Sequence, residues 1–191
     1  MMRLRWTRRS ERFETEALPH LPALFRMARQ LVGPEAADDL VQETFLRAWK
    51  YFDTFDKSTN CRAWLFRILR NVWITRWRKV RLELPLTEMQ EELIEPYYDW
   101  EDDFLREELS AEVKGALSQL PSEYRMTVLL ADVEEFAYKE ISHIMDCPIG
   151  TVMSRLNRGR RMLGRMIRTR RQEVRPEMQI APPEQPVRRK I

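Results

Sequence analysis

The stretch from Thr151 to Arg161 carries side chains that can read the edges of DNA bases. Arginine and asparagine can each make paired hydrogen bonds to a base in the major groove, while serine and threonine can make single ones. The predicted base-reading set is Thr151, Met153, Ser154, Arg155, Asn157, Arg158 and Arg161. More arginines follow, up to Arg171, and no acidic residue lies between Cys147 and Gln172. This run is suited to salt-sensitive contacts with phosphates.

The elements that would position these side chains form a helix-turn-helix. The sequence predicts a short helix over 137–145, a tight turn over 146–150 and a long basic helix from Thr151, its expected cap, to about Ile167. Apolar residues of the two helices would face each other: Ile141, Ile144, Val152 and Leu156. A helix-turn-helix places its second helix in the major groove. The alternative is an ordinary helical hairpin with a solvated basic face.

A second group of residues, on a helix predicted over 61–79, is suited to single-stranded nucleic acid. One face of this helix is aliphatic, with Leu65, Ile68, Leu69 and Val72. The opposite face combines aromatic and basic side chains: Phe66, Arg70, Trp73 and Trp77. Unstacked bases can lie on aromatic rings while guanidinium groups hold phosphates. The alternative, equally open for either tryptophan alone, is that both are core residues packed against a linker or a neighbouring helix.

Catalytic and metal chemistry find little support. The five glycines form no phosphate-binding loop and no nucleophile elbow. His143 and Cys147 could supply two zinc ligands, but zinc takes about four, and the other candidates, His20 and Cys61, are distant in the sequence. We therefore predict that the protein is not an enzyme and has no cofactor and no metal site.

The composition indicates a protein of the cytoplasm. No apolar run approaches the roughly 20 residues that cross a bilayer, so we expect no membrane insertion. The basic amino terminus is followed by glutamates rather than by an apolar stretch, which argues against a secretory signal. Two cysteines fit a reducing compartment.

Charge divides the 191 residues into three blocks. Residues 1–82 carry a net charge of +8, residues 83–113 carry −11 and residues 114–191 carry +6. Two basic modules joined by an acidic connector suggest that both modules face a polyanion, and nucleic acid is the first candidate.

Helical periodicity and proline positions complete the predicted organisation. Apolar spacing predicts helices over 21–32 and 35–51, separated by Gly33 and Pro34, and a loop over 53–60 follows. We predict an all-α fold of two small helical domains joined by a flexible acidic linker. The expected divisions are a basic N-terminal extension (1–13), a first domain (14–82), a linker (83–103), a second domain (104–168) and a disordered tail (169–191).

Three motifs in this order resemble the bacterial sigma-70 family, specifically its small extracytoplasmic-function (group IV) RNA polymerase sigma factors. Residues 39–49 resemble conserved regions 2.1 to 2.2, residues 63–71 resemble regions 2.3 to 2.4 and residues 147–160 resemble region 4.2. The segments 58–60 and 148–156 look most like the subgroup controlled by zinc-containing anti-sigma factors.

The resemblance implies two domains, sigma-2 and sigma-4, that bind core RNA polymerase at its beta-prime clamp helices and beta flap. Sigma-2 would contact core polymerase through a charged patch of Asp39, Gln42, Glu43 and Arg47. The alternative is that these residues form an ordinary solvated helix face. Sigma-2 would capture the melted minus-ten strand with residues of the loop and of the helix that follows: Phe55, Lys57, Ser58, Asn60, Arg70, Asn71, Trp73 and Trp77. The alternative for the loop residues is helix capping by Thr59 or Asn60. Sigma-4 would read the duplex minus-35 element.

The function implied is that of a sigma factor. It would direct core polymerase to stress-response promoters, promote melting and be held inactive by an anti-sigma factor. The alternative class is a two-domain helix-turn-helix regulator that binds duplex DNA without being a polymerase subunit. The aromatic and basic helix near Trp73 argues against that alternative, because reading duplex DNA does not require it.

Overall fold

The structure is a computed structural model that describes residues 2–56, 59–83 and 111–173. Its α-helices are α1 (Met2–Glu16), α2 (Leu21–Val32), α3 (Pro34–Tyr51), α4 (Cys61–Glu83), α5 (Ala111–Leu117), α6 (Ser122–Val128), α7 (Tyr138–Met145) and α8 (Ile149–Glu173). Short helical turns cover Leu18–His20 and Phe52–Thr54, and a π-helical turn, Leu129–Val133, continues α6. The described residues contain no strand, so the predicted all-α fold class is confirmed.

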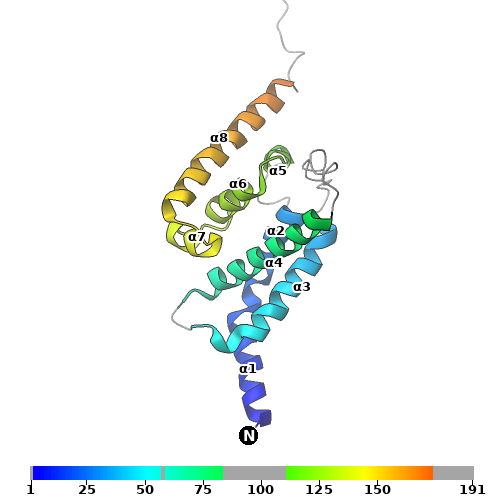
Figure 1. The fold of residues 1–191 in the computed structure, drawn as a ribbon, viewed down its shortest axis with the longest axis vertical. Coiled ribbons are helices and arrows are strands. Elements are labelled where there is room, and N and C mark those ends of the chain that lie inside the picture. The colour runs from blue at the N-terminus through cyan, green and yellow to red at the C-terminus, as the bar shows by residue number, and fades with distance from the viewer. Residues whose placement is uncertain (1, 57–58, 84–110, 174–191) are drawn as a thin grey trace, which may run out of the picture.

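Helices α2, α3 and α4 form the first group (Figure 1). The break between α2 and α3 falls at Gly33, whose φ of 80° lies in the region that glycine adopts without strain. Pro34 then begins α3, where the missing N–H of proline costs nothing. The three helices bury Leu40 and the predicted aliphatic residues Leu65 and Leu69.

Most of the expected basic N-terminal extension (1–13) belongs to helix α1, which packs on the first group. Its Phe13 is buried and meets Trp49 and Phe52 edge to face, with ring centroids 5.1 and 5.0 Å apart. Arg9 and Arg12 lie over these same two rings, 4.4 and 4.7 Å from the centroids. Because guanidinium groups are attracted to ring faces, these arginines help to attach the segment.

Helices α5 to α8 form the second group, in which α7 and α8 make the predicted helix-turn-helix. The turn between them contains Asp146 with a positive φ of 49°. Helix α8 begins at Ile149, so Thr151 is not its cap as we expected, and the Pro148 carbonyl accepts hydrogen bonds from the N–H groups of Thr151 and Val152. The helix ends at Glu173, so it includes the first residues of the predicted tail; the rest lies outside the described residues.

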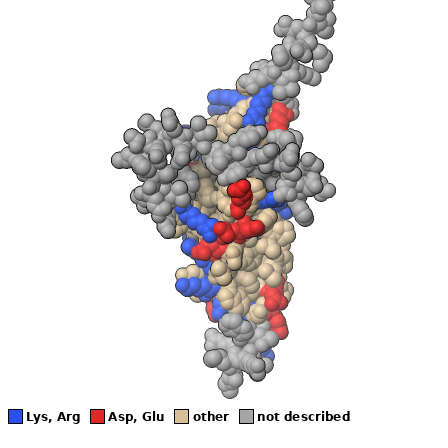
Figure 2. All heavy atoms as spheres, turned by 90° about the vertical axis from the view of Figure 1, so that its right-hand side faces the viewer, with Lys and Arg blue, Asp and Glu red and all other residues tan. Residues whose placement is uncertain are grey.

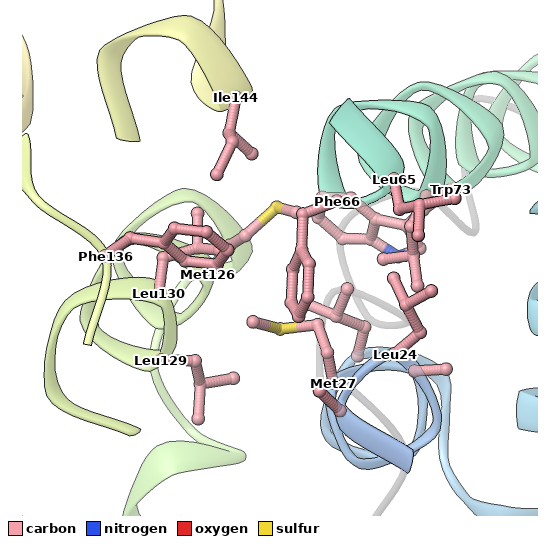
Figure 3. Close-up of a cluster of buried hydrophobic side chains, with 14 of the residues drawn as sticks. Leu24, Met27, Leu65, Phe66, Trp73, Met126, Leu129, Leu130, Phe136 and Ile144 are labelled. Atoms are coloured by element: carbon pink, nitrogen blue, oxygen red, sulfur yellow. The ribbon is translucent and has the colours of Figure 1, made fainter. Parts of the chain in front are cut away.

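The two groups pack directly against each other, which the sequence did not predict. Helix α7 lies against α4, and one continuous hydrophobic core includes residues of both groups. Figure 3 shows Phe66 of α4 between Met27 of α2 and the side chains of Met126 and Phe136 from the second group. The predicted linker, with Tyr97, Tyr98 and Trp100, lies mostly outside the described residues.

Among the described residues, no helix is long and apolar enough to cross a membrane. On the face that Figure 2 presents, acidic and basic side chains lie next to each other in small groups rather than in one field of a single sign. The net charge of each block along the sequence therefore does not describe this face.

Candidate nucleic-acid interface

The outer side of α8 presents most of the predicted base-reading residues. Met153 is 54% exposed, an unusual position for a large apolar side chain, and the polar members around it are exposed as well: Ser154, Asn157, Arg158 and Arg161. Together with Tyr138 of α7, part of this side lines an open hollow of about 650 Å³ that continues along α8 to Arg165 and Arg168. The helix therefore offers polar donors, an apolar contact and a basic flank on one surface.

Two arginines of α8 turn back onto the protein instead. Arg155, a member of the predicted base-reading set, donates to the Glu123 carboxylate at 2.6 Å, lies 3.7 Å from the Cys147 sulfur and is half-buried. Arg160 donates to the Asp132 carboxylate at 3.0 Å, and this hydrogen bond raises the pKa of its guanidinium. These ion pairs fasten α8 to α6 and to the turn that follows α6, and they hold the exposed side outward.

On α4 the tryptophan prediction needs a correction. Trp73 is only 8% exposed and lies on the side of α4 that faces Leu24 of α2 (Figure 3), and Phe66 is fully buried. Position 73 lies only about 40° around the helix from the buried Leu69, so the neighbours that cover Leu69 can also cover Trp73. In this conformation Trp73 is a core residue, which is the alternative that the sequence left open. The side chain of Trp77 lies outside the described residues.

The polar residues of α4 remain nearer the surface. Asn71 is exposed and accepts a hydrogen bond from Arg70 at 3.3 Å. Arg70 is half-buried, and desolvation lowers the pKa of its guanidinium, with the opposing influence of Asp146 second in size. These two residues therefore form a connected polar pair on α4.

The loop before α4 holds one buried and one exposed candidate. The Phe55 ring is buried between Phe52 and Trp64, at centroid distances of 6.1 and 4.9 Å, so it is not accessible to a base in this conformation. Asn60 is exposed and its Oδ1 accepts from the N–H groups of Arg62 and Ala63 at 3.0 and 3.4 Å, which is the capping role that we considered. Lys57 and Ser58 lie outside the described residues.

The charged patch on α3 contains a residue that the sequence analysis missed. Asp39 and Gln42 are exposed, and Glu43 accepts from Arg47 at 2.7 Å. Leu46, at 59% exposure, shares their face, because positions 39, 42, 43 and 46 follow the helical repeat. Its spacing outside the buried apolar stripe was the available signal. An exposed leucine within a charged rim is typical of a protein-binding surface.

The fold and the site define a helix-turn-helix DNA-binding protein with a second helical domain. Residues 18–83 match the family Sigma-70 region 2, and residues 110–163 match Sigma-70, region 4. The chain belongs to the extracytoplasmic-function (ECF) family of RNA polymerase sigma factors. It is therefore a sigma factor that directs RNA polymerase to promoters, and the regulator alternative is set aside. Sigma factors are regulatory rather than catalytic subunits.

Sequence and structure comparisons with known proteins support membership of the ECF sigma factor family. The chain is 35% identical over 153 residues to the ECF sigma factor EcfG of Rhodopseudomonas palustris, covering 80% of this chain and 83% of that protein. It is 33% identical over 149 residues to SigW of Bacillus subtilis, covering 73% and 80%. The structure of RpoE in complex with the anti-sigma factor NepR from Bartonella quintana matches with a TM-score of 0.66 and 31% identity, over 83% of this chain and 98% of that one.

A second solved structure is also similar to this chain. CnrH, in complex with the cytosolic domain of CnrY, matches with a TM-score of 0.61 and 26% identity over 84% of this chain and 90% of that one. The resemblance to ECF sigma factors and the fold of two sigma domains are thus confirmed. We call the group α1 to α4 sigma-2 and the group α5 to α8 sigma-4.

Proposed function

We propose that sigma-4 reads the minus-35 element with the outer side of α8. The observation that carries this assignment is the exposure of Met153, Asn157 and Arg158 on one side of a helix-turn-helix recognition helix. Arg161, Arg165 and Arg168 continue along the same helix and supply contacts to phosphates. Arg155 must leave Glu123 before it can reach a base, so its contribution depends on that exchange.

We propose that sigma-2 holds the melted minus-ten strand with the loop before α4 and the polar residues of α4. Asn60, Arg70 and Asn71 carry this role, since Phe55 and Trp73 are buried in the described conformation. Lys57, Ser58 and Trp77 stay predictions from the sequence. Extruding a base costs a few kcal/mol, which edge hydrogen bonds and stacking must return.

Permanganate footprinting tests the minus-ten assignment. Polymerase carrying Asn71→Ala should bind the duplex promoter but leave its thymines unreactive, while a premelted promoter should restore transcription. Thr75→Ala, one turn away on α4, is a matched control with an exposed side chain. A normal bubble with the Asn71 variant removes that residue from the melting site.

We propose that the α3 patch, with Leu46 at its centre, docks on the beta-prime clamp helices of core polymerase, and that sigma-4 contacts the beta flap. The patch combines an exposed apolar side chain with Asp39, Gln42 and the Glu43–Arg47 ion pair. Co-purification with core polymerase tests this contact directly. The wild-type chain should elute with core, whereas a regulator that never touches polymerase would not.

We propose that an anti-sigma factor controls this chain, because RpoE, which is 31% identical to it, was solved bound to the anti-sigma factor NepR. That the partner contains zinc stays a prediction from residues 58–60 and 148–156, and metal analysis of the purified natural complex tests it. We further propose that the protein acts in the cytoplasm on stress-response promoters. The domain limits 14–82 and 104–168 also remain proposals.

A further inference from the structure

Sigma-4 places three carboxylates against the end of sigma-2 that begins α4. The Glu134 carboxylate contacts Arg26 of α2 and Arg62 of α4. The Glu140 carboxylate accepts a hydrogen bond from Asn60 at 2.7 Å, and the Asp146 carboxylate lies 3.8 Å from Arg67. Acidic groups from one domain therefore follow a line of basic and amide groups on the other.

Glu134 is the most enclosed of the three. It is only 2% exposed, and two guanidinium groups converge on its carboxylate: Arg26 at 3.4 Å from Oε1, and Arg62, which contacts Oε2. Arg62 also donates to the Glu134 backbone carbonyl at 2.8 Å. Because a buried charge is tolerated only when it is paired, the position of this carboxylate depends on both arginines.

Apolar and backbone contacts surround this ion-pair cluster. Phe66 of α4 and Phe136 of sigma-4 meet edge to face with centroids 5.0 Å apart, and Arg62 lies over the Phe136 ring at 4.5 Å. Arg125 of α6 donates to the Gln30 carbonyl of α2 at 3.1 Å. The domain contact is thus packed and specific rather than a loose electrostatic association.

The groups that sigma-4 covers are suited to nucleic acid. Arg62 is two residues after Asn60, and Arg67 and Arg70 continue along α4. Two arginines that converge on one carboxylate also have the geometry to hold one phosphate, because guanidinium forks bind both groups through paired hydrogen bonds.

We propose that Arg26 and Arg62 form a phosphate-binding site for the melted promoter strand, and that Glu134 of sigma-4 occupies this site in the closed molecule as a substitute for the phosphate. This inference rests on the proposed role of sigma-2 in holding single-stranded DNA. Glu140, which is hydrogen-bonded to Asn60, and Asp146, which lies beside Arg67, take the place of further phosphates along α4 in the same way. Separation of the two domains on core polymerase removes the three carboxylates and exposes the site. The free sigma factor therefore binds single-stranded DNA weakly.

The test measures binding of the full chain, without polymerase, to a fluorescein-labelled dT12 oligonucleotide by fluorescence anisotropy. Phosphate contacts do not depend on sequence, so this probe reports the site without knowledge of the promoter. Glu134→Gln should raise the affinity about tenfold. It should also steepen the plot of log affinity against log salt by about 0.7, the contribution of one phosphate contact to a single strand.

A matched control separates the site from a general change in charge. Asp132→Asn removes the same charge two residues away, where the carboxylate pairs with Arg160 of α8 instead of with sigma-2. It should change dT12 affinity less than threefold. Adding Arg62→Ala to Glu134→Gln should cancel the gain. Equal effects of Glu134→Gln and Asp132→Asn, or a gain that survives loss of Arg62, would overturn the proposal.

A charge exchange keeps the proposal testable if the Glu134 variant does not fold. The double variant Glu134→Arg with Arg62→Glu retains an ion pair, so small-angle scattering should give the wild-type radius of gyration, whereas Glu134→Arg alone should give a larger one. The same radius for wild type and the single variant would contradict the closure. Transcription by wild type on core polymerase reports the proposed function separately, so normal transcription without a gain in dT12 binding refutes only this inference.

Discussion

Single arginine substitutions on α8 should separate base reading from phosphate binding. Arg158 is exposed beside Met153 and Asn157, at the part of the helix that enters a groove, while Arg165 lies about two turns further on. A bidentate contact to a base discriminates by about 1–3 kcal/mol. Arg158→Ala should therefore lower binding to promoters with the preferred base by roughly 5- to 150-fold and relax preference at that position. Arg165→Ala should weaken all sequences equally and reduce the salt slope by about 0.9.

The assay is binding of the reconstituted polymerase to a panel of single-base minus-35 variants, at several salt concentrations. Arg160→Ala is the matched control, because it removes one positive charge from the same helix at a side chain that Asp132 already holds. It should change neither the base preference nor the salt slope beyond a small uniform effect. If Arg158 and Arg165 variants lost affinity uniformly across the panel, α8 would not read bases.

Three further predictions concern the other surfaces. Leu46→Asp should weaken binding to core polymerase at least tenfold, and because the side chain is exposed the melting temperature should not change. Leu21→Asp, at an exposed leucine of α2, should not weaken this binding, and equal losses would move the docking site off α3. Phe13→Ala should lower the free energy of unfolding by about 3 kcal/mol in urea titrations, since the buried ring contacts three aromatic neighbours. A change below about 0.5 kcal/mol would mean that α1 is not attached to sigma-2. Burial raises the pKa of the Cys61 thiol from 9.0 to about 11, so alkylation should stay slow at pH 8, and rapid alkylation there would refute the burial. Because the folded state retains the thiol proton to higher pH than the unfolded state, its stability should fall as pH rises from about 9 to 11.

The sequence predicted the elements that local patterns determine. Helical spacing located α2, α3 and the helix-turn-helix, because their apolar residues repeat at the period of a single helix. It missed α1, whose attachment depends on one phenylalanine and on arginines that stack over rings of α3 and of the turn that follows it. No local pattern signals such a contact.

The site was predictable on α8 and misread on α4 for a related reason. An exposed recognition helix depends on its own side chains, whereas the burial of Trp73 and Phe66 depends on packing against α2 and sigma-4. The partners of Glu134 lie 72 and 108 residues away in the sequence, so its burial also could not be read from its neighbours. Leu46 could have been found from its spacing outside the buried apolar stripe, whereas the half-burial of Arg155 depends on Glu123, which lies 32 residues away in the sequence.

Run-off transcription tests the central claim most directly. Core RNA polymerase, a duplex promoter chosen by selection with the reconstituted polymerase and a premelted version of it are transcribed with and without this chain. We predict a discrete run-off product from the duplex promoter only when the chain is present, and loss of that product with the Leu46→Asp variant. Binding of the chain to the duplex promoter without any run-off product from either template would contradict its assignment as a sigma factor.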